Sequence, residues 1–482
     1  MSASYFLIHL LLILDIICII AVIFFERKNP ASTIAWVLVL IFVPLLGVAA
    51  YVAFGSGFPA RKKRKYDLKA ARDSIYDDEL IKYLNISGTN SASCDPVNKR
   101  VIEYLKTEGD GIYTDHNQVR VFLDGRSKFT SLLNDINNAR EHIHLFYYIF
   151  KNDEIGKEVL AALEEKAKHG VRVRVMYDGL GSIMGLSQMF KPLKNAGGKI
   201  MAFSPLLFNL SPRIRVNYRN HRKIVVIDGQ IGYVGGMNIG DEYLGRDKKL
   251  YPWRDTHLRL TGPSVWFLQE RFFMDWLYAL EEDPEPRNLE KYFPVPIAEG
   301  DIGVQIVSSG PDKADKTPIK SGFLQMIYDA ADNVFIQTPY FIPDDSVIDA
   351  LRIAARSGVD VRLMIPRKTD SILVQQANMA YAQLIIGCGV KVFFYEGFLH
   401  AKTITCDSKV TSIGTANMDM RSFALNFEVN AFIYNHEFAS AHAAYFEEDL
   451  KNCEEIDEHW FDGRPPLARA ARKIARLFAP LM

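Results

Sequence analysis

Two short stretches of the sequence carry the same reactive residue types at the same spacing. Residues 221–228 and residues 400–407 both read H-x-K-x4-D. The apolar and β-branched run between each Lys and Asp is typical of a strand, on which alternate residues face the same side. Each imidazole is therefore expected beside a fixed cation. The candidate catalytic residues are His221, Lys223, Asp228, His400, Lys402 and Asp407.

The similarity of the two copies continues beyond the motif. Each copy is followed by a turn and by a second strand, which ends at Asn238 in the first copy and at Asn417 in the second. Seventeen positions separate His221 from Asn238, and the same number separates His400 from Asn417. Two copies in one register indicate an internal duplication rather than a coincidence.

These residue types suit chemistry at a phosphodiester. Its negative oxygens repel nucleophiles, so a catalyst without a metal needs a neutral nucleophile, nearby cations and an acid for the leaving alkoxide. One His would form a phosphohistidine, while the other would protonate the leaving oxygen and later deprotonate the incoming alcohol. Lys223 and Lys402 would stabilise the phosphate oxygens, with Asn238 and Asn417 as neutral hydrogen-bond donors. The lysines would repel a metal ion, so neither a metal nor another cofactor is expected.

A nucleophilic imidazole must present one unprotonated nitrogen, so its other N–H needs an acceptor. Glu428 and Asp255 are the candidates for this role. Glu428 follows Asn417 by eleven positions, whereas Asp255 follows Asn238 by seventeen, so the two halves differ here.

Other titratable residues are assigned structural roles. Asp228 and Asp407 end the motif strands and are expected to brace the loops rather than to touch substrate. The remaining histidines considered are expected to be surface or core residues, namely His116, His142, His144, His257 and His436.

The doubled motif resembles the signature of the phospholipase D superfamily. Residues 253–257 and 414–428 are similar to its bacterial cardiolipin synthase branch, and the resemblance covers nearly the whole chain. It implies His221 as nucleophile, His400 as acid and base, and an orienting acid at Glu428. It also implies phosphatidylglycerol as substrate, cardiolipin and glycerol as products, and a reaction that glycerol can reverse.

Three other functions remain open from the residues alone. A hydrolytic phospholipase D would use the same residues and differ only in letting water reach the phosphohistidine. A nuclease would share the chemistry, but nucleic-acid binders usually carry a basic footprint, and here 57 basic residues balance 57 acidic ones. A non-catalytic membrane scaffold is disfavoured because both motifs are intact. We therefore expect a phospholipid substrate and no nucleic-acid partner.

Two α/β halves are expected to position the motifs. A helix, a strand, a helix and a strand follow one another over residues 129–176, and the same order recurs over residues 323–365. We therefore expect an α/β fold of two homologous phospholipase D-like mixed-sheet domains facing each other. They cover residues 112–282 and 301–460, and residues 283–300 form the linker.

The N-terminus is expected to be a transmembrane hairpin within residues 1–58. Residues 5–25 and 33–54 are each apolar enough to cross the hydrocarbon core, which needs about 20 residues. No basic region precedes the first span, which argues against a signal peptide. The basic cluster at residues 61–65 places the rest of the chain in the cytoplasm by the positive-inside rule. This predicts a multi-pass protein of the bacterial cell membrane, in which Asp15 is protonated or paired between helices.

Two flanking segments complete the chain. Residues 59–111 are interpreted as a basic juxtamembrane linker with some helix over residues 97–106. Residues 461–482 are expected to form an amphipathic helix, either at the membrane interface or packed on the catalytic domain. Its apolar face comprises Leu467, Ala471, Ile474, Phe478 and Leu481, and its basic face Arg469, Arg472, Lys473 and Arg476. The five scattered cysteines favour a reducing compartment, and the oligomeric state is left open.

Overall fold

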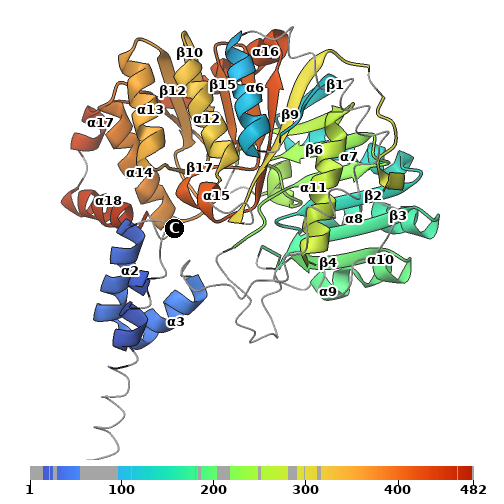
Figure 1. The fold of residues 1–482 in the computed structure, drawn as a ribbon, viewed down its shortest axis with the longest axis horizontal. Helices are drawn as coiled ribbons and strands as arrows, with labels where there is room; N and C mark the ends of the chain where they lie inside the picture. The colour runs from blue at the N-terminus through green and yellow to red at the C-terminus, as the bar shows by residue number, and fades with distance from the viewer. Residues whose placement is uncertain are drawn as a thin grey trace, which may run out of the picture.

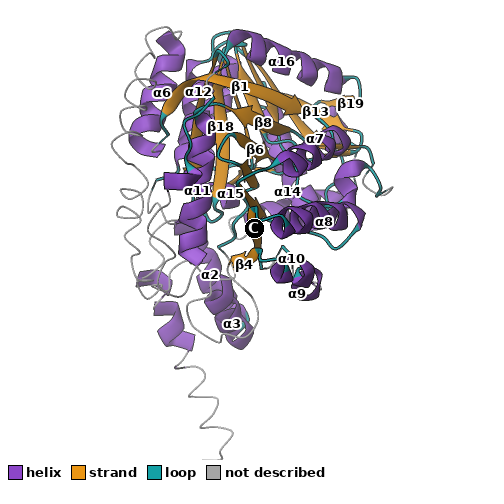
Figure 2. Ribbon diagram, turned by 90° about the vertical axis from the view of Figure 1, so that its right-hand side faces the viewer, coloured by secondary structure: helices purple, strands orange, loops and turns teal. Residues whose placement is uncertain are grey.

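The computed structural model describes residues 13, 15–20, 22–24, 30–54, 96–109, 111–179, 181–182, 186–203, 218–247, 251–279, 290–297, 299–311, 316–463 and 465–479. Two halves lie next to each other and share one large sheet, with helices packed against it (Figures 1 and 2). The duplication expected from the sequence is therefore present in three dimensions.

The first half alternates strands with helices. Its strands are β1 (Tyr113–Phe122), β2 (His142–Tyr147), β3 (Arg172–Asp178), β4 (Lys199–Phe203), β5 (Ile224–Ile227), β6 (Ile231–Gly235), β7 (Trp253–Arg254) and β8 (His257–Thr261). Its helices are α7 (Gly125–Asn138), α8 (Glu154–Lys168), α9 (Leu186–Met189), α10 (Lys191–Asn195) and α11 (Ser264–Ala279), with short 3-10 turns at Asp241–Leu244 and Glu290–Tyr292.

The second half repeats this order and adds elements at its C-terminal end. Its strands are β9 (Ile302–Ser309), β10 (Asn333–Gln337), β11 (Phe341–Ile342), β12 (Asp360–Pro366), β13 (Lys391–Tyr395), β14 (Phe398–Leu399), β15 (Thr403–Cys406), β16 (Val410–Gly414), β17 (Met418–Asp419), β18 (Glu428–Tyr434) and β19 (Cys453–Ile456). Its helices are α12 (Pro318–Asp329), α13 (Asp345–Arg356), α14 (Ile372–Ile386), α15 (Met420–Ala424), α16 (His436–Leu450), α17 (His459–Asp462) and α18 (Pro466–Phe478).

The strand order shows the duplication directly. From its outer edge to the centre, the first half runs β4-β3-β2-β5-β6-β8-β1, and the second runs β13-β12-β10-β15-β16-β18-β9, with β19 added at the outer edge. The two series meet where β1 pairs antiparallel with β9, so the sheet of fifteen strands is continuous. The halves are thus joined edge to edge into one sheet, a closer union than the two facing domains expected.

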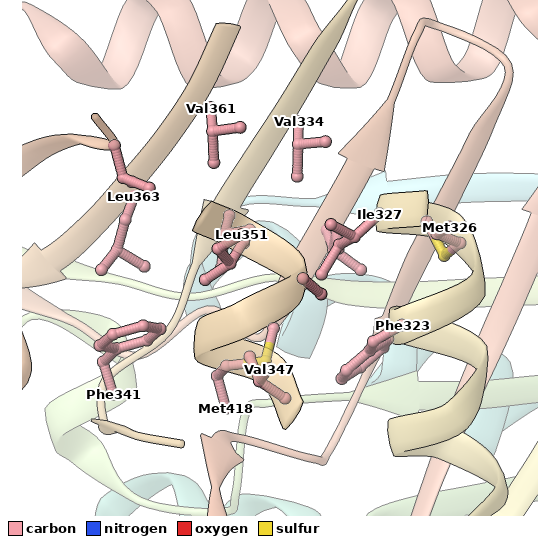
Figure 3. Close-up of a cluster of buried hydrophobic side chains, with 14 of the residues drawn as sticks. Phe323, Met326, Ile327, Val334, Phe341, Val347, Leu351, Val361, Leu363 and Met418 are labelled. Atoms are coloured by element: carbon pink, nitrogen blue, oxygen red, sulfur yellow. The ribbon is translucent and has the colours of Figure 1, made fainter. Parts of the chain in front are cut away.

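Both faces of the sheet are buried, and the strand residues alternate between two cores. On β10, Val334 and Ile336 pack with α12 and α13, whereas Phe335 packs with Phe446 of α16 on the opposite face. Figure 3 shows the first of these cores, in which side chains of α12 and α13 meet those of β10 and β12. Because successive residues point to opposite faces and both faces are buried, the strands are almost continuous apolar runs in the sequence.

Helix α6 (Pro96–Gly109) was expected as part of the linker but packs on the second half. Its residues Val101, Ile102 and Leu105 are buried in the same core as α12. The basic cluster and most of the rest of the expected linker lie outside the described residues, as does the acidic, proline-rich segment between the halves.

The second expected membrane span, residues 33–54, is divided between two helices. These are α2 (Pro30–Phe42) and α3 (Pro44–Phe54). Pro44 lies at the division, and the rings of Trp36 and Tyr51 are 5.3 Å apart, so α3 packs back on α2. Within the described ranges, no single helix is both long and apolar enough to cross a membrane. Much of the first expected span falls outside those ranges.

Candidate active site

The two motif histidines lie in short extended segments just before their strands, not within them. Strand β5 begins at Ile224 and β15 at Thr403, so each H-x-K triplet precedes the strand that was expected to carry it. The strands still anchor the triplets, because they are central in the sheet and fully buried.

Each triplet is also fixed by the other half of the protein. The His221 backbone N–H donates to the Phe427 carbonyl at 2.9 Å, directly before Glu428. The His400 backbone N–H donates to the Arg254 carbonyl at 2.7 Å, directly before Asp255. The two loops therefore exchange backbone contacts symmetrically across the junction of the halves.

The side chain of each motif histidine also contacts a carboxylate from the other half. The Nδ1 atom of His221 lies 3.1 Å from both carboxylate oxygens of Glu428, which is fully buried. Thr415 donates to the same carboxylate at 2.5 Å, and its backbone oxygen is 3.1 Å from His221 Nδ1. A proton on Nδ1 would thus be held by Glu428, which leaves Nε2 of His221 with the lone pair.

The second pair is formed in the same manner from the opposite halves. The Nδ1 atom of His400 lies 2.7 Å from the Oδ2 atom of Asp255, which is also fully buried. The other carboxylate oxygen of Asp255 accepts from the Thr256 backbone N–H at 2.7 Å. Asp255 therefore occupies the position equivalent to Glu428 despite its different spacing in the sequence.

The environment keeps both imidazoles neutral. Burial lowers the pKa of His400 to about 3, and the positive charge of Lys402 acts in the same direction. Burial also lowers the pKa of His221, against the opposing charge of Glu428. Burial alone would raise the pKa of Glu428, but its contact with His221, the charge of Lys223 and the hydrogen bond from Thr415 hold this pKa below its usual value. The arrangement pairs neutral bases with a buried anion, which suits nucleophilic attack.

The two motif lysines lie beside their histidines. The Nζ atom of Lys223 donates to the backbone oxygen of His221 at 2.6 Å. The Nζ atom of Lys402 donates to the backbone oxygen of His400 and also lies 2.9 Å from the Nδ1 atom of His400. Burial lowers the pKa of Lys402 to about 8 and that of Lys223 well below its usual value. Two cations held in a dry site without full solvation are suited to receive an anionic phosphodiester.

The two asparagines that follow the motifs line the same cavity as the histidines. Asn238 accepts from the Ile149 backbone N–H at 3.1 Å and donates to the Tyr243 hydroxyl at 2.6 Å. Asn417 is buried, and its Oδ1 atom has no hydrogen-bond partner among the described residues. Both amides therefore lie at the cavity wall, and their expected role as donors to the phosphate stays a prediction.

Asp228 and Asp407 lie behind the site, not in it. The carboxylate of Asp228 accepts from three backbone N–H groups, those of residues 140 to 142, at 2.8 to 2.9 Å. Asp407 does the same for residues 331 to 333. Both adopt positive φ at 53° where the motif strand turns. These contacts are with the loops that support the sheet, which is the bracing role expected of both residues, and a direct part in catalysis stays a prediction.

The cavity that contains the two histidines has a volume of about 450 Å³. Its wall includes several residues that the sequence analysis did not single out. Aromatic rings flank the imidazoles. The ring centre of Tyr148 lies 5.0 Å from that of His221, and the ring centres of Trp253 and Phe398 lie 5.5 and 5.8 Å from that of His400. The charged lining residues are Lys151, Arg219, Glu242, Asp247, Asp370, Asp419 and Arg421.

Three of these charged residues had a signal in the sequence. Arg219 lies two positions before His221, and Asp419 and Arg421 lie two and four positions after Asn417, so all three are close to the motifs. Trp253 also lies within a segment that resembles the family, whereas Tyr148 and Phe398 had no such signal and reach the cavity only through the fold. Burial raises the pKa of Asp419, another member of the wall, to about 6.

A buried arginine next to His221 bonds to both halves of the protein. Arg222 is fully buried, and its guanidinium donates to the Asp275 carboxylate at 2.5 Å. The same guanidinium donates to the backbone oxygens of Glu428 and Ser309, both at 3.0 Å. The x position of the first motif is therefore a structural brace across the junction.

Among the described residues, the other five histidines considered from the sequence do not line the cavity. His116 and His436 are exposed, as expected for surface residues, while His142, His144 and His257 are buried. His142 and His144 share the side-chain oxygen of Gln269, each at 3.1 Å. In the part of the chain that the structure describes, no group of three or more His, Cys, Asp or Glu residues could hold a metal ion.

The fold and the site together define the class of the protein. Two copies of H-x-K-x4-D from homologous halves meet in one cavity, which is the arrangement of a two-motif phospholipase D-like protein. Among solved structures, the chain is similar to phosphatidylserine synthase of Haemophilus influenzae Rd KW20, with a TM-score of 0.61 and 14% identity over 79% of this chain and 98% of the other. That likeness supports the fold alone.

Sequence comparisons identify the branch. The family model described as "Cardiolipin synthase, PLD-like domain" matches residues 132–250 and 323–450, and "Phospholipase_D-nuclease N-terminal" matches residues 13–56. The major cardiolipin synthase ClsA of Bacillus subtilis (strain 168) is 44% identical over 100% of both chains. A cardiolipin synthase of Oceanobacillus iheyensis is 42% identical over 100% of both, and one of Staphylococcus aureus is 42% identical over 98% of this chain and 95% of its own. The chain belongs to the bacterial cardiolipin synthase family of the phospholipase D superfamily.

Proposed function

We propose that this chain joins two phosphatidylglycerol molecules into cardiolipin and releases glycerol, through a phosphohistidine. The observation that carries the proposal is the reciprocal pairing of His221 with Glu428 and of His400 with Asp255 at one cavity. Two neutral imidazoles with two adjacent lysines supply a nucleophile, an acid and cations without a metal ion.

In the first step, Nε2 of His221 attacks the phosphorus of phosphatidylglycerol. The nitrogen–phosphorus bond forms as the bond from phosphorus to the glycerol oxygen breaks, and His400 gives that oxygen its proton. The anionic phosphodiester raises the pKa of the nearby His400 when it binds, so that the imidazole can carry this proton. Lys223 and Lys402 stabilise the equatorial oxygens while charge builds on them.

In the second step, the terminal hydroxyl of another phosphatidylglycerol enters where glycerol left. His400 takes the proton of that hydroxyl, the new oxygen–phosphorus bond forms, and the bond to His221 breaks. The number of phosphodiester bonds is unchanged, so the reaction needs no nucleotide and glycerol can reverse it. The assignment of His221 as nucleophile rests on its likeness to the superfamily.

The membrane arrangement is also a proposal. Large apolar side chains of the N-terminal segment are exposed, among them Ile16, Phe24, Phe42 and Leu46. An exposed apolar surface of this size suits contact with lipid. We infer that residues 1–58 anchor the protein in the bacterial cell membrane as a hairpin, with the catalytic halves on the cytoplasmic side.

The experiment is a product analysis with labelled phosphatidylglycerol in vesicles and with EDTA present. Purified full-length protein should yield cardiolipin and free glycerol, and the His221→Ala and His400→Ala variants should yield neither. Arg352→Ala serves as the control, since this exposed arginine of α13 pairs with the exposed Asp349 and is not among the residues that line the cavity. Phosphatidic acid as the main product would make the protein a hydrolase and reject the synthase.

A further inference from the structure

The C-terminal helix α18 packs on the second half through its small residues. Ala475 is buried, as is Ala479 just beyond the helix end, and Arg472 is buried with its guanidinium 5.2 Å from the centre of the Phe461 ring. Helix α14 forms most of the contact surface, and α18 lies along it at the edge of the molecule (Figure 1). The buried face of α18 thus contains alanines and an arginine stem.

The large apolar side chains of α18 face outward instead. Leu467 is 82% exposed, Ile474 is 55% exposed and Leu477 is 72% exposed. Their spacing of seven and three positions puts them on one side of the helix. A helix that only covered a soluble core would bury these residues and expose the alanines. The interpretation that α18 simply packs on the catalytic domain therefore leaves its apolar face unexplained.

Helix α14, which packs against α18, also exposes large apolar side chains in its first turn. Ile372 is 81% exposed and Leu373 is 46% exposed. Arg476 lies over the Tyr381 ring, so the last turn of α18 lies beside the middle of α14. We call Ile372, Leu373, Leu467, Ile474 and Leu477 the apolar ledge.

The ledge adjoins the entrance of the catalytic cavity. Asp370, two positions before Ile372, lines that cavity, and its carboxylate oxygens both lie 2.9 Å from the Tyr340 hydroxyl. Asp370 is exposed, so this part of the cavity wall reaches the surface. Ile372 and Leu373 therefore present apolar side chains to solvent close in the chain to this exposed part of the cavity wall.

Positive charge accompanies the ledge. Arg469, Lys473 and Arg476 are exposed on α18, and the helix contains no acidic residue. The whole chain carries equal numbers of basic and acidic residues, so this concentration is local. Exposed apolar side chains flanked by cations are the pattern of a helix that lies in the interface of an anionic bilayer. In Figure 1, α18 lies at the same end of the molecule as the apolar helix α2.

We propose that α18 and the first turn of α14 form a membrane-docking surface for anionic bilayers, which holds the rim of the catalytic cavity against the lipid headgroups. The occupant is the lipid surface, because the ledge combines apolar and basic groups and adjoins the entrance. The proposal uses the proposed function only in taking a phospholipid as substrate. The N-terminal segment tethers the protein, whereas the ledge sets the orientation of the catalytic halves.

The test compares two forms of one substrate in the full-length protein. The Ile474→Asp/Leu477→Asp variant should lose about tenfold or more of its cardiolipin synthesis on vesicles containing phosphatidylglycerol. It should retain its rate on monomeric short-chain phosphatidylglycerol, which needs no bilayer. The matched control is Ile353→Asp, an equally apolar and half-exposed position on α13, which should leave both rates unchanged.

The charges are tested with Arg469→Glu/Lys473→Glu. This variant should have a reduced rate on vesicles that no longer depends on salt, whereas the rate of the parent protein should fall at roughly 0.5 M salt. Equal losses on vesicles and on monomeric substrate in either variant would overturn the proposal, as would equal losses in Ile353→Asp.

A second measurement does not depend on activity. Phosphatidylglycerol that carries a photoreactive acyl chain should label peptides of residues 466–478 in the parent protein, and much less in Ile474→Asp/Leu477→Asp. Labelling confined to the N-terminal segment, or cross-links from α18 to a second copy of the chain, would reject the lipid surface. If the parent makes no cardiolipin from either substrate, the proposed function fails, and the photolabelling still decides the docking surface.

Discussion

Glu428 lies 3.1 Å from the imidazole of His221, although 207 positions separate them in the chain. The second half thus provides the buried acid for the histidine of the first half, and Asp255 of the first half does the same for His400 of the second. Neither half contains a histidine oriented by its own acid. The candidate site is therefore formed at the junction, and each half alone lacks the acid that pairs with its histidine.

The reciprocal pairing predicts the effect of neutralising either acid. Glu428→Gln and Asp255→Asn should each reduce kcat by roughly 10²- to 10⁴-fold, because the amide no longer fixes the imidazole tautomer or stabilises its cation. The rates of cardiolipin formation in both variants, with thermal unfolding as a check on folding, measure this. A variant that keeps full activity would show that its acid does not orient the histidine.

The separate roles of the two histidines can be distinguished with an activated substrate. A phosphatidyl ester of p-nitrophenol has a leaving group that needs little protonation. His400→Asn should therefore still release a burst of p-nitrophenol as the phosphohistidine forms, whereas His221→Asn should release none. Rapid-mixing absorbance measures the burst. The opposite pattern would assign the nucleophile to His400.

Gly236 should be essential for the position of Asp255. A methyl group at this position would overlap the Oδ1 atom of Asp255, which is fully buried and cannot move aside freely. Gly236→Ala is thus expected to displace the carboxylate from His400 and to reduce kcat by about 10²-fold or more. Gly463→Ala is the control, because a methyl group there has no neighbour within 4 Å. Equal kinetics for the two variants would contradict the expectation.

The pKa of Lys402 should appear in the pH dependence of the reaction. Burial lowers this pKa to about 8, so the ammonium loses its proton as the pH rises through 8. If the charged form stabilises the phosphate, kcat/KM should fall on the alkaline side of about pH 8. Lys402→Arg should be slower at neutral pH but should lack this alkaline decline, since a guanidinium stays protonated. A profile that is unchanged in the variant would assign the decline to another group.

Asp407 is expected to affect stability more than chemistry. Its carboxylate accepts from three backbone N–H groups of the loop before β10. Asp407→Ala should lower the free energy of unfolding by roughly 2 to 4 kcal/mol, because several donors lose their acceptor at once. Denaturant unfolding measures this against Asp349→Ala, an exposed residue of α13. A loss of kcat at full stability would instead place Asp407 in the reaction.

The motif histidines could be recognised as candidate site residues from the sequence because a local spacing repeats, and the structure brings both to one cavity. Their partners could not be assigned in the same way. Glu428 and Asp255 were both recognised as acids of the right kind, but spacing carries no information on which His each acid meets across the junction. The aromatic wall around His400 escaped prediction for a related reason, since Trp253 and Phe398 come together through the pairing of β7 with β14.

The fold, too, could be predicted from the sequence only in part. The order of helices and strands in each half followed from periodicity, as the agreement at α7 and α13 illustrates. The union of the halves into one sheet depends on the pairing of β1 with β9, which are separated by more than 180 positions. For α18, periodicity placed Leu467 and Ile474 on one apolar face, and only the structure shows that both are turned outward. Arg472, which was expected on the basic face, is buried instead.

The continuous sheet has a consequence for how substrates are exchanged. Strands β1 and β9 are hydrogen-bonded at the junction, so both motif histidines are held by one continuous sheet. Both histidines line one cavity, so under the proposed function glycerol has to leave that cavity before the second lipid can take its place. Glycerol that accumulates is then expected to compete with the second phosphatidylglycerol for this place.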